Sequence, residues 1–248
     1  PWNYKFTWNP RNVVLAGQGG AASFLRNGRH KYIPYNRLFG RLDHMSVDGY
    51  GDFVGYANRD SLSYRETYGI QDVPTIFRGT LRRPGYCKAW DVFIELGMTD
   101  DSYQMSNTAN LTPRTFLNTF LPYHAKTSVE EKFKEFLRED RIDTYERFEW
   151  LGLFKDEPFL GIENASPAQA LQKILVNKLS LKDGDKDMLV MIHEFEYELK
   201  GSKKQITSSM VNIGEDQIFT SMSNTVGLPA AICAKMILTG KLKNKGVT

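Results

Sequence analysis

The sequence is poor in the side chains that bind metals or form disulfides. Its 248 residues include only two cysteines, Cys87 and Cys233, and four histidines. The cysteines lie far apart, each inside an apolar pattern with helical spacing, so we expect two buried core thiols in a reducing compartment. No group of cysteines and histidines has the spacing of a metal site, and we expect no metal.

Long apolar runs are also missing. The longest one, residues 230–238, contains Lys235 and falls short of the roughly 20 residues that a membrane span needs. The opening stretch, PWNYKFTWNP, has no signal-peptide pattern, and it does not begin with methionine, which suggests a piece of a longer chain. We expect a cytoplasmic protein with no membrane partner.

An excess of either charge is lacking as well. The 32 Lys and Arg are interleaved with 29 Asp and Glu, for a net charge of +3, so no basic stripe predicts nucleic-acid binding. With 41% hydrophobic residues and no low-complexity tract, the chain has the composition of a folded globular protein.

The common catalytic motifs G-x-S-x-G, HExxH and CxxC are absent. One segment, residues 12–22, does fit the G-x-G-x-x-G/A form of a dinucleotide loop. However, Asn9-Pro10 predicts a helix start upstream of it, and Gly28 predicts the end of that helix after Asn27. No acidic residue follows at the spacing that ribose binding needs. The sequence favours a packed helix that contains glycines, with a dinucleotide loop as the alternative.

The spacing of the apolar residues changes along the chain, from the alternation of strands to the period of helices. Strand patterns at residues 50–57 and 75–82 precede a long helical stretch, whose starts are Pro84, Thr112-Pro113, the Ser128–Glu131 capping box and Asp143 with Glu146. Ser166-Pro167 then starts a helix over 168–179. A hairpin formed by 188–199 and 205–213 and a helix at about 224–239 follow.

This order predicts an α/β fold with an all-helical insertion. Residues 1–84 and 163–222 are expected to form one discontinuous α/β domain, and residues 85–162 the insertion. Residues 223–248 are expected to form a C-terminal helix.

The second half of the first hairpin strand carries a row of carboxylates. Glu194, Glu196 and Glu198 share one face, opposite lysines 203 and 204 of the returning strand, and we expect this face to be solvated. His193 lies on the other face, and we expect it to be buried and hydrogen-bonded.

Three arginines crowd the six positions 78–83, and a fourth, Arg59, ends the strand before them. Arg78, Thr80 and Arg82 share one strand face, so the guanidinium groups are expected to gather where two strands end. Arginine binds carboxylates and phosphates through its planar fork. Two interpretations stay open: an anionic-ligand site, or ion pairs with Asp52, Asp60 or Asp72.

At these residues the chain resembles the glutamate-forming saccharopine dehydrogenase family. The resemblance is carried by Asn58-Arg59-Asp60-Ser61, by Arg78-Gly79-Thr80-Leu81-Arg82 and by Pro84-Gly85-Tyr86. Further matches are YKFTWNP at 4–10, the stretch 187–195 and TVGLPAA at 225–231.

The resemblance implies the substrate-binding and dimerisation part of an oxidoreductase that uses NADP, or NAD, bound on a domain absent from this chain. It implies that Arg59, Thr80, Leu81 and Arg82 contact a saccharopine-like amino-acid adduct, with Asn58 and Arg78 behind them. The C-terminal helix would return to the cofactor domain. The enzyme would act in lysine metabolism and would be a homodimer. No catalytic acid or base is implied in this part.

Arg83 departs from the pattern, because the family tends to place an aromatic residue there. An extra cation would suit a different adduct, so a carboxynorspermidine dehydrogenase-like enzyme is one alternative. A non-catalytic anion-binding or dimerisation module is the other.

Overall fold

The computed structural model describes residues 1–247, which combine helices with three small antiparallel sheets, as the α/β prediction expected. Residues 1–180 form one compact unit and a second begins at Leu181. The elements of the first are α1 (Pro10–Val14), β1 (Ala22–Arg26), β2 (Arg29–Ile33), η1 (Tyr35–Arg37), β3 (Leu42–Val47), β4 (Gly51–Ala57), α2 (Tyr64–Thr67), β5 (Gly79–Arg82), α3 (Tyr86–Glu95), α4 (Pro113–Thr119), α5 (Val129–Arg141), η2 (Ile142–Thr144), α6 (Tyr145–Leu151) and α7 (Pro167–Leu179). The second contains β6 (Met188–Leu199), β7 (Ser202–Ile213) and α8 (Ser221–Leu238).

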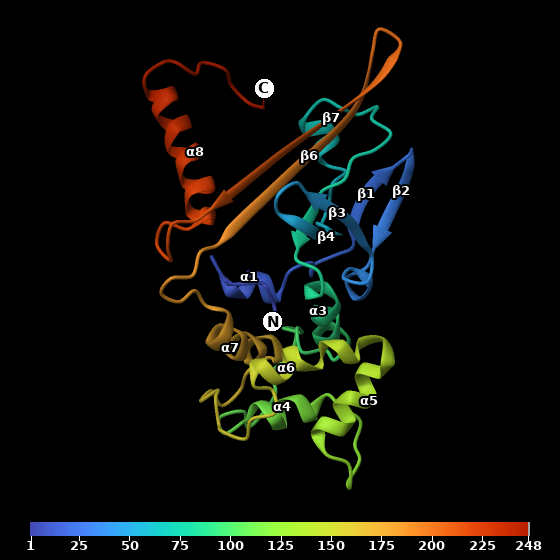
Figure 1. Cartoon of the computed structure of the whole chain (residues 1–248), viewed down its shortest axis with the longest axis vertical. Coiled ribbons are helices and arrows are strands. Elements are labelled where there is room, and N and C mark those ends of the chain that lie inside the picture. The colour runs from blue at the N-terminus through green and yellow to red at the C-terminus, as the bar shows by residue number, and fades with distance from the viewer. Residues whose placement is uncertain (248) are drawn as a thin grey trace. The chain divides into compact units, whose positions relative to one another are not determined.

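Within the first unit, strands β1 to β5 gather at one end and helices α4 to α7 at the other, with α3 between them (Figure 1). β1 and β2 form a hairpin, and β3, β4 and β5 form a three-stranded sheet in that order. β5 is therefore an edge strand of its sheet, and no strand among residues 1–247 pairs with its other side.

The predicted helix starts at Thr112, Ser128 and Ser166 are confirmed. Each side chain accepts a hydrogen bond from the backbone N–H of the residue three positions on, and the side chain of that residue accepts one from the backbone N–H of the cap. These capping boxes depend only on residues close in sequence, which is why the pattern predicts them well.

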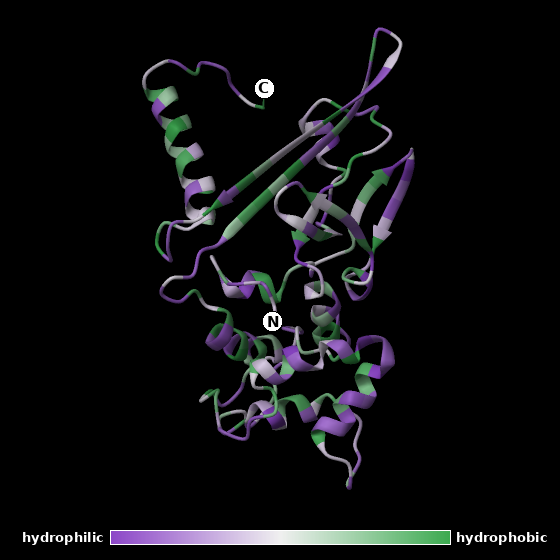
Figure 2. Ribbon diagram, viewed as in Figure 1, coloured by the Kyte–Doolittle hydropathy of each residue, from purple (hydrophilic) through white to green (hydrophobic). Residues whose placement is uncertain are grey.

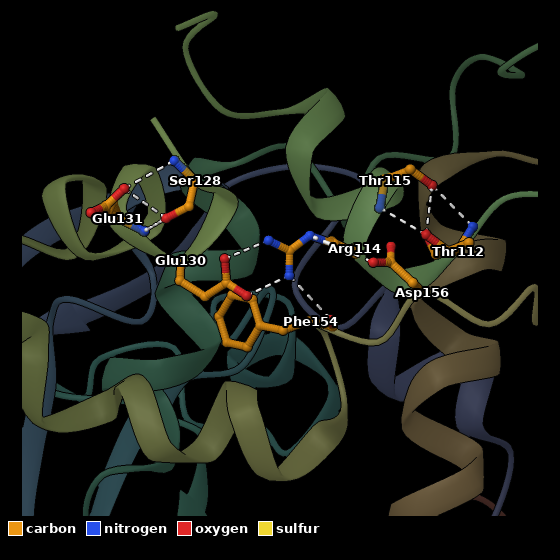
Figure 3. Close-up of polar contacts among 8 residues, drawn as sticks. All are labelled: Thr112, Arg114, Thr115, Ser128, Glu130, Glu131, Phe154 and Asp156. Atoms are coloured by element: carbon orange, nitrogen blue, oxygen red, sulfur yellow. Dashed lines mark hydrogen bonds and ion pairs between the residues drawn. The ribbon is translucent and has the colours of Figure 1, made fainter. Parts of the chain in front are cut away.

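A bidentate ion pair joins the start of α4 to the start of α5. Both terminal nitrogens of Arg114 donate to the carboxylate of Glu130, and Nη1 also reaches the carbonyl oxygen of Phe154 at 3.4 Å (Figure 3). Asp156 lies 3.9 Å from the same guanidinium. Arg114 thus ties two helices and the loop after α6 together.

Aromatic rings fill the core between α3, α5 and α6. The ring centre of Phe148 lies 5.2 Å from that of Phe93 and 4.9 Å from that of Phe133. Trp2 stacks on Phe93 with 5.9 Å between ring centres. All four side chains are buried. The N-terminal segment is therefore held in place by the helical end of the unit.

The prediction of one helix from Pro10 to Asn27 is wrong. α1 ends at Val14, and residues 22–26 form β1 instead. Asn27 and Gly28, with φ of 52° and 73°, form the two-residue turn to β2. Asn-Gly is the strongest short-range hairpin signal, because both residues tolerate positive φ.

The alternative of a dinucleotide loop at Gly17–Gly20 is also unsupported. These glycines follow a five-residue helix rather than a strand, and they lead into β1 rather than into a helix. The geometry that aims a helix N-terminus at a pyrophosphate is therefore lacking.

Two further element predictions need correction. Asp143 does not start the fourth helix: α6 begins at Tyr145, and Asp143 pairs with Lys88 of α3 at 2.6 Å. The strand expected from Thr75 shortens to β5, because Ile76 bridges to Leu25 of β1 instead.

In the second unit, the predicted hairpin and final helix are confirmed. β6 and β7 pair along their whole length through the turn Lys200-Gly201. The Asp187 carboxylate accepts hydrogen bonds from the backbone N–H groups of Ser221 (2.5 Å) and Met222 (3.0 Å), which fixes the start of α8 against the base of the hairpin.

Many apolar side chains of this unit are exposed, among them Phe195, Ile206 and Ile232, and Figure 2 shows hydrophobic residues along both the hairpin and α8. Glu194, Glu196 and Glu198 are solvated, as expected. His193 and Cys233 are exposed, so their predicted burial is wrong, whereas Cys87 is buried as expected. An amphipathic pattern shows which residues share a face but not whether anything covers that face.

None of the described helices is long and apolar enough to cross a bilayer. Helices α3 to α6 lie within the predicted insertion, 85–162. The discontinuous domain of residues 1–84 and 163–222 stays a prediction.

Candidate functional site

The candidate site centres on β5, at the edge of its sheet. Thr80 pairs with Tyr56, and Arg82 pairs with Val54, so these four residues face the same side. β5 ends at Arg82, and Gly85, with φ of 86°, turns the chain into α3. The turn puts Tyr86, the first residue of α3, close behind Arg82.

Three tyrosines surround the guanidinium of Arg82. Its central carbon lies 5.1 Å from the ring centre of Tyr4, 5.3 Å from Tyr86 and 5.9 Å from Tyr56. At these distances the rings attract the cation, and the attraction is strongest where water is excluded. We call Arg82, Tyr4, Tyr56 and Tyr86 the tyrosine cage.

The hydrogen-bonding needs of Arg82 are only partly met. Nη1 donates to the carbonyl oxygen of Leu81 at 2.9 Å, while Nε is buried and has no partner among residues 1–247. Over the same residues, no carboxylate forms an ion pair with Arg82. Buried charges are normally paired, so a half-buried guanidinium of this kind is suited to an anion from outside.

The electrostatics of the tyrosine cage keep the cation charged and the phenols neutral. Burial raises the pKa of Tyr4 and raises that of Tyr86 well above its usual value, although Arg82 opposes both shifts. Burial works to lower the pKa of Arg82, but Tyr56, Tyr86 and Tyr4 outweigh it and the pKa rises. At neutral pH the site offers a positive charge and phenolic O–H donors, the groups that bind a carboxylate.

The buried thiol of Cys87, the residue after Tyr86 in α3, is inert. Burial raises the pKa of Cys87 to about 12 against the opposing effect of Arg82. Because the thiolate is the nucleophile, Cys87 is a core side chain rather than a reactive one.

Arg59 and Arg78 lie at the other end of β5. Ala57 pairs with Gly79 there, and the backbone N–H of Asn58 donates to the carbonyl oxygen of Arg78 at 2.8 Å. Arg82 instead pairs with Val54, three residues away from Ala57 along β4. The prediction that all the guanidinium groups gather at one place is therefore wrong.

Each arginine at this end has a different environment. The guanidinium of Arg78 lies 4.1 Å from the ring centre of Tyr64 and reaches the carbonyl oxygen of Asp60 at 3.4 Å. Arg59 has a φ of 49° and an exposed side chain that contacts no described polar group. Neither forms an ion pair with Asp52, Asp60 or Asp72, so the ion-pair interpretation finds no support among the described residues.

Asp60 and Ser61 hold the loop that presents Arg59. The Asp60 carboxylate accepts hydrogen bonds from the Ser23 hydroxyl and the Leu62 backbone, each at 2.8 Å. The buried Ser61 hydroxyl accepts one from the Arg78 backbone at 3.0 Å. The motif Asn58–Ser61 thus ties the end of β4 to β1 and to the start of β5.

Asp60 gives a testable pH dependence. Hydrogen bonds from Ser63 and Ser23 lower its pKa to about 2, from an ordinary value of 3.8. The ionised form therefore stabilises the fold fully above pH 4, and this contribution disappears as the pH falls from about 4 to 2. Because the side chain is exposed, we expect Asp60→Ala to cost only about 1 kcal/mol at pH 7.

Urea unfolding of the 248-residue chain at several pH values measures this effect. The difference in the free energy of unfolding between wild type and Asp60→Ala should narrow as the pH falls from about 4 to about 2. Asp72→Ala, which removes an exposed carboxylate with no described hydrogen bond, is the control and should show little gap at any pH. A constant gap for Asp60→Ala would contradict the assignment.

Arg83, the departure from the family pattern, has a structural role. Its Nη1 donates to the carbonyl oxygens of Tyr50 (2.6 Å) and Asp52 (3.3 Å), and its guanidinium lies 4.2 Å from the ring centre of Phe53. Arg83 thus stabilises the turn between β3 and β4, on the sheet face opposite Arg82. Leu81 also points to that opposite face, so only its backbone is beside Arg82.

The structure brings together Thr80, Arg82 and the backbone of Leu81, and separately Asn58, Arg59 and Arg78. Sequence reasoning missed the tyrosine cage. The available signal was weak: Tyr56 faces Thr80 only once the register of β4 and β5 is known, and Tyr4 is far away in sequence.

The comparisons with known proteins agree on one family. The whole chain, residues 1–248, matches the saccharopine dehydrogenase C-terminal domain. It is 36% identical to the mitochondrial alpha-aminoadipic semialdehyde synthase of Mus musculus, of which it covers 27%. It is 31% identical to the saccharopine dehydrogenase [NADP(+), L-glutamate-forming] of Schizosaccharomyces pombe, of which it covers 56%.

A solved structure of apo saccharopine dehydrogenase (L-Glu forming) from Saccharomyces cerevisiae matches the whole chain with a TM-score of 0.84 and 28% identity. The chain spans 56% of that protein. It covers about half the length of the fungal relatives it matches and about a quarter of the length of the mammalian ones. The chain belongs to the saccharopine dehydrogenase C-terminal domain family.

Proposed function

We propose that the chain is the substrate-binding C-terminal portion of an NADP-dependent oxidoreductase of lysine metabolism that acts on saccharopine. The observation that supports this proposal most directly is Arg82, a half-buried cation with an unpartnered Nε and no carboxylate partner among the described residues. Saccharopine carries three carboxylates, so its pocket needs several fixed cations.

In this proposal Arg82 binds one carboxylate and the exposed Arg59 binds another. Their placement at opposite ends of β5 suits a long substrate with separated carboxylates better than a single small anion. Thr80 and the backbone of Leu81 form the edge between them. Asn58 and Arg78 hold Arg59 in position through the loop contacts described above.

The implied reaction oxidises the secondary amine of saccharopine. When bound, NADP, or NAD, would accept the hydride that leaves the carbon next to this nitrogen. The nitrogen would lose a proton, and water would then cleave the imine to glutamate and aminoadipate semialdehyde. The described residues form no dinucleotide loop, so the cofactor would bind to a part of the protein outside this chain. In the same proposal α8 returns to that part, and the protein is a cytoplasmic homodimer with no nucleic-acid or membrane partner.

The test is an activity assay of the complete protein that contains this chain. With saccharopine and NADP, we expect an increase in absorbance at the nicotinamide band and formation of glutamate. Saccharopine binding without any absorbance change would favour a non-catalytic module. Activity with carboxynorspermidine but not with saccharopine would assign a different adduct.

A further inference from the structure

The segment that carries Tyr4 is anchored on both sides. Trp2 is buried among the rings of Phe93 and Phe148. Phe6 is buried as well, and its backbone N–H donates to the carbonyl oxygen of Leu179 at 2.8 Å. Trp2 also packs edge-on against Tyr86 at 5.8 Å between ring centres. Tyr4 is therefore held beside Arg82 mainly by contacts outside the tyrosine cage.

The three hydroxyls of the tyrosine cage differ in what they contact. Tyr86 interacts with Arg82, and Tyr56 interacts with Thr80. The Tyr4 ring packs at 5.1 Å from Tyr86 and 5.6 Å from Phe6, but no described residue forms a hydrogen bond with its hydroxyl. Tyr4 is half-buried rather than enclosed, so its hydroxyl is free to bind a ligand.

The free hydroxyl and the cation are neighbours. The guanidinium carbon of Arg82 lies 5.1 Å from the ring centre of Tyr4. A carboxylate has two oxygens, and one can accept from a guanidinium N–H while the other accepts from a phenolic O–H. Because burial keeps the phenol protonated, it remains a donor at neutral pH.

We propose that Tyr4 is a second ligand of the substrate carboxylate that Arg82 binds, so that its hydroxyl and the guanidinium hold one carboxylate between them. This inference rests on the proposed function, and it adds a binding residue from the N-terminal segment. A site of this shape selects a planar carboxylate presented between two donors.

The experiment removes the hydroxyl and keeps the ring. In the complete protein, Tyr4→Phe should weaken saccharopine binding about tenfold or more, the effect of losing a hydrogen bond to a charged group. The loss should appear in Kd by titration calorimetry and in KM rather than kcat. Tyr64→Phe is the matched control, because Tyr64 packs against Arg78 in the same way and should leave Kd unchanged.

A double substitution separates binding from packing. If Tyr4 and Arg82 hold one carboxylate, Tyr4→Phe should have a much smaller effect when Arg82 is already methionine, because neighbouring contributions are not additive. An unchanged Kd for Tyr4→Phe, with binding still lost in Arg82→Met, would overturn the inference and leave the proposed function standing. A wild-type protein that does not bind saccharopine would overturn both.

Discussion

Replacing Arg82 with methionine is expected to reduce the affinity for saccharopine about a hundredfold. Methionine keeps an unbranched apolar side chain but has no charge, so the change removes the charge-assisted hydrogen bonds to a carboxylate, worth roughly 1.5–3 kcal/mol each. Each 1.4 kcal/mol corresponds to tenfold in Kd. Calorimetric titration of the complete protein with saccharopine measures the loss.

The fold should tolerate this substitution. A half-buried cation without a carboxylate partner contributes little net stability, because its desolvation opposes its contacts with the tyrosine rings. We therefore expect the melting temperature of Arg82→Met to stay within a few degrees of wild type. A large loss of stability with unaltered affinity would show that Arg82 holds the tyrosine cage together instead of binding substrate.

Arg83→Met is the matched control for Arg82→Met. The two arginines are adjacent, but Arg83 donates to the carbonyl oxygens of Tyr50 and Asp52 on the opposite sheet face. Its loss should cost about 1 kcal/mol of stability and leave Kd unchanged.

The largest expected effect on stability is at Phe148. Its ring has no exposed surface and contacts Trp2 at 6.1 Å, Phe93 at 5.2 Å and Phe133 at 4.9 Å. Phe148→Ala leaves a cavity where the N-terminal segment, α3, α5 and α6 meet, and we expect a loss of about 3–5 kcal/mol. Urea unfolding of the chain measures this change.

The control for the core substitution is Tyr123→Ala, at a side chain that is 88% exposed. Its effect should stay within about 0.5 kcal/mol. A loss below 1 kcal/mol at Phe148 would mean that the surrounding rings collapse into the cavity, and the aromatic cluster would then not be the rigid anchor of the Trp2–Phe6 segment.

Helix starts were the most predictable part of the fold. Thr112, Ser128 and Ser166 cap helices as expected, because each cap is a set of hydrogen bonds between residues three positions apart. The β6–β7 hairpin was equally predictable, since two alternating runs flank a short Lys-Gly turn.

The first thirty residues show where local patterns mislead. The run from Pro10 has a helix start, yet α1 lasts only five residues. Positive φ at Gly17, Gly19 and Gly20 breaks the helix, and residues 22–26 instead pair with 29–33 across the Asn27-Gly28 turn. Strand pairing and an Asn-Gly turn outweighed a weak helical preference.

By itself, the sequence determined the helix caps, the β6–β7 hairpin and the presence of an arginine-rich strand, because these depend on neighbours in the chain. Only the tertiary structure decided what each arginine does. Alternation along β5 separates Arg82 from Arg83, but the register with β4 and the packing of Tyr4 and Tyr86 decide that Arg82 sits in a cage while Arg83 holds a turn. Contacts between residues 4, 56, 82 and 86 exist only when packing of the whole unit brings distant segments together, and no local pattern encodes them.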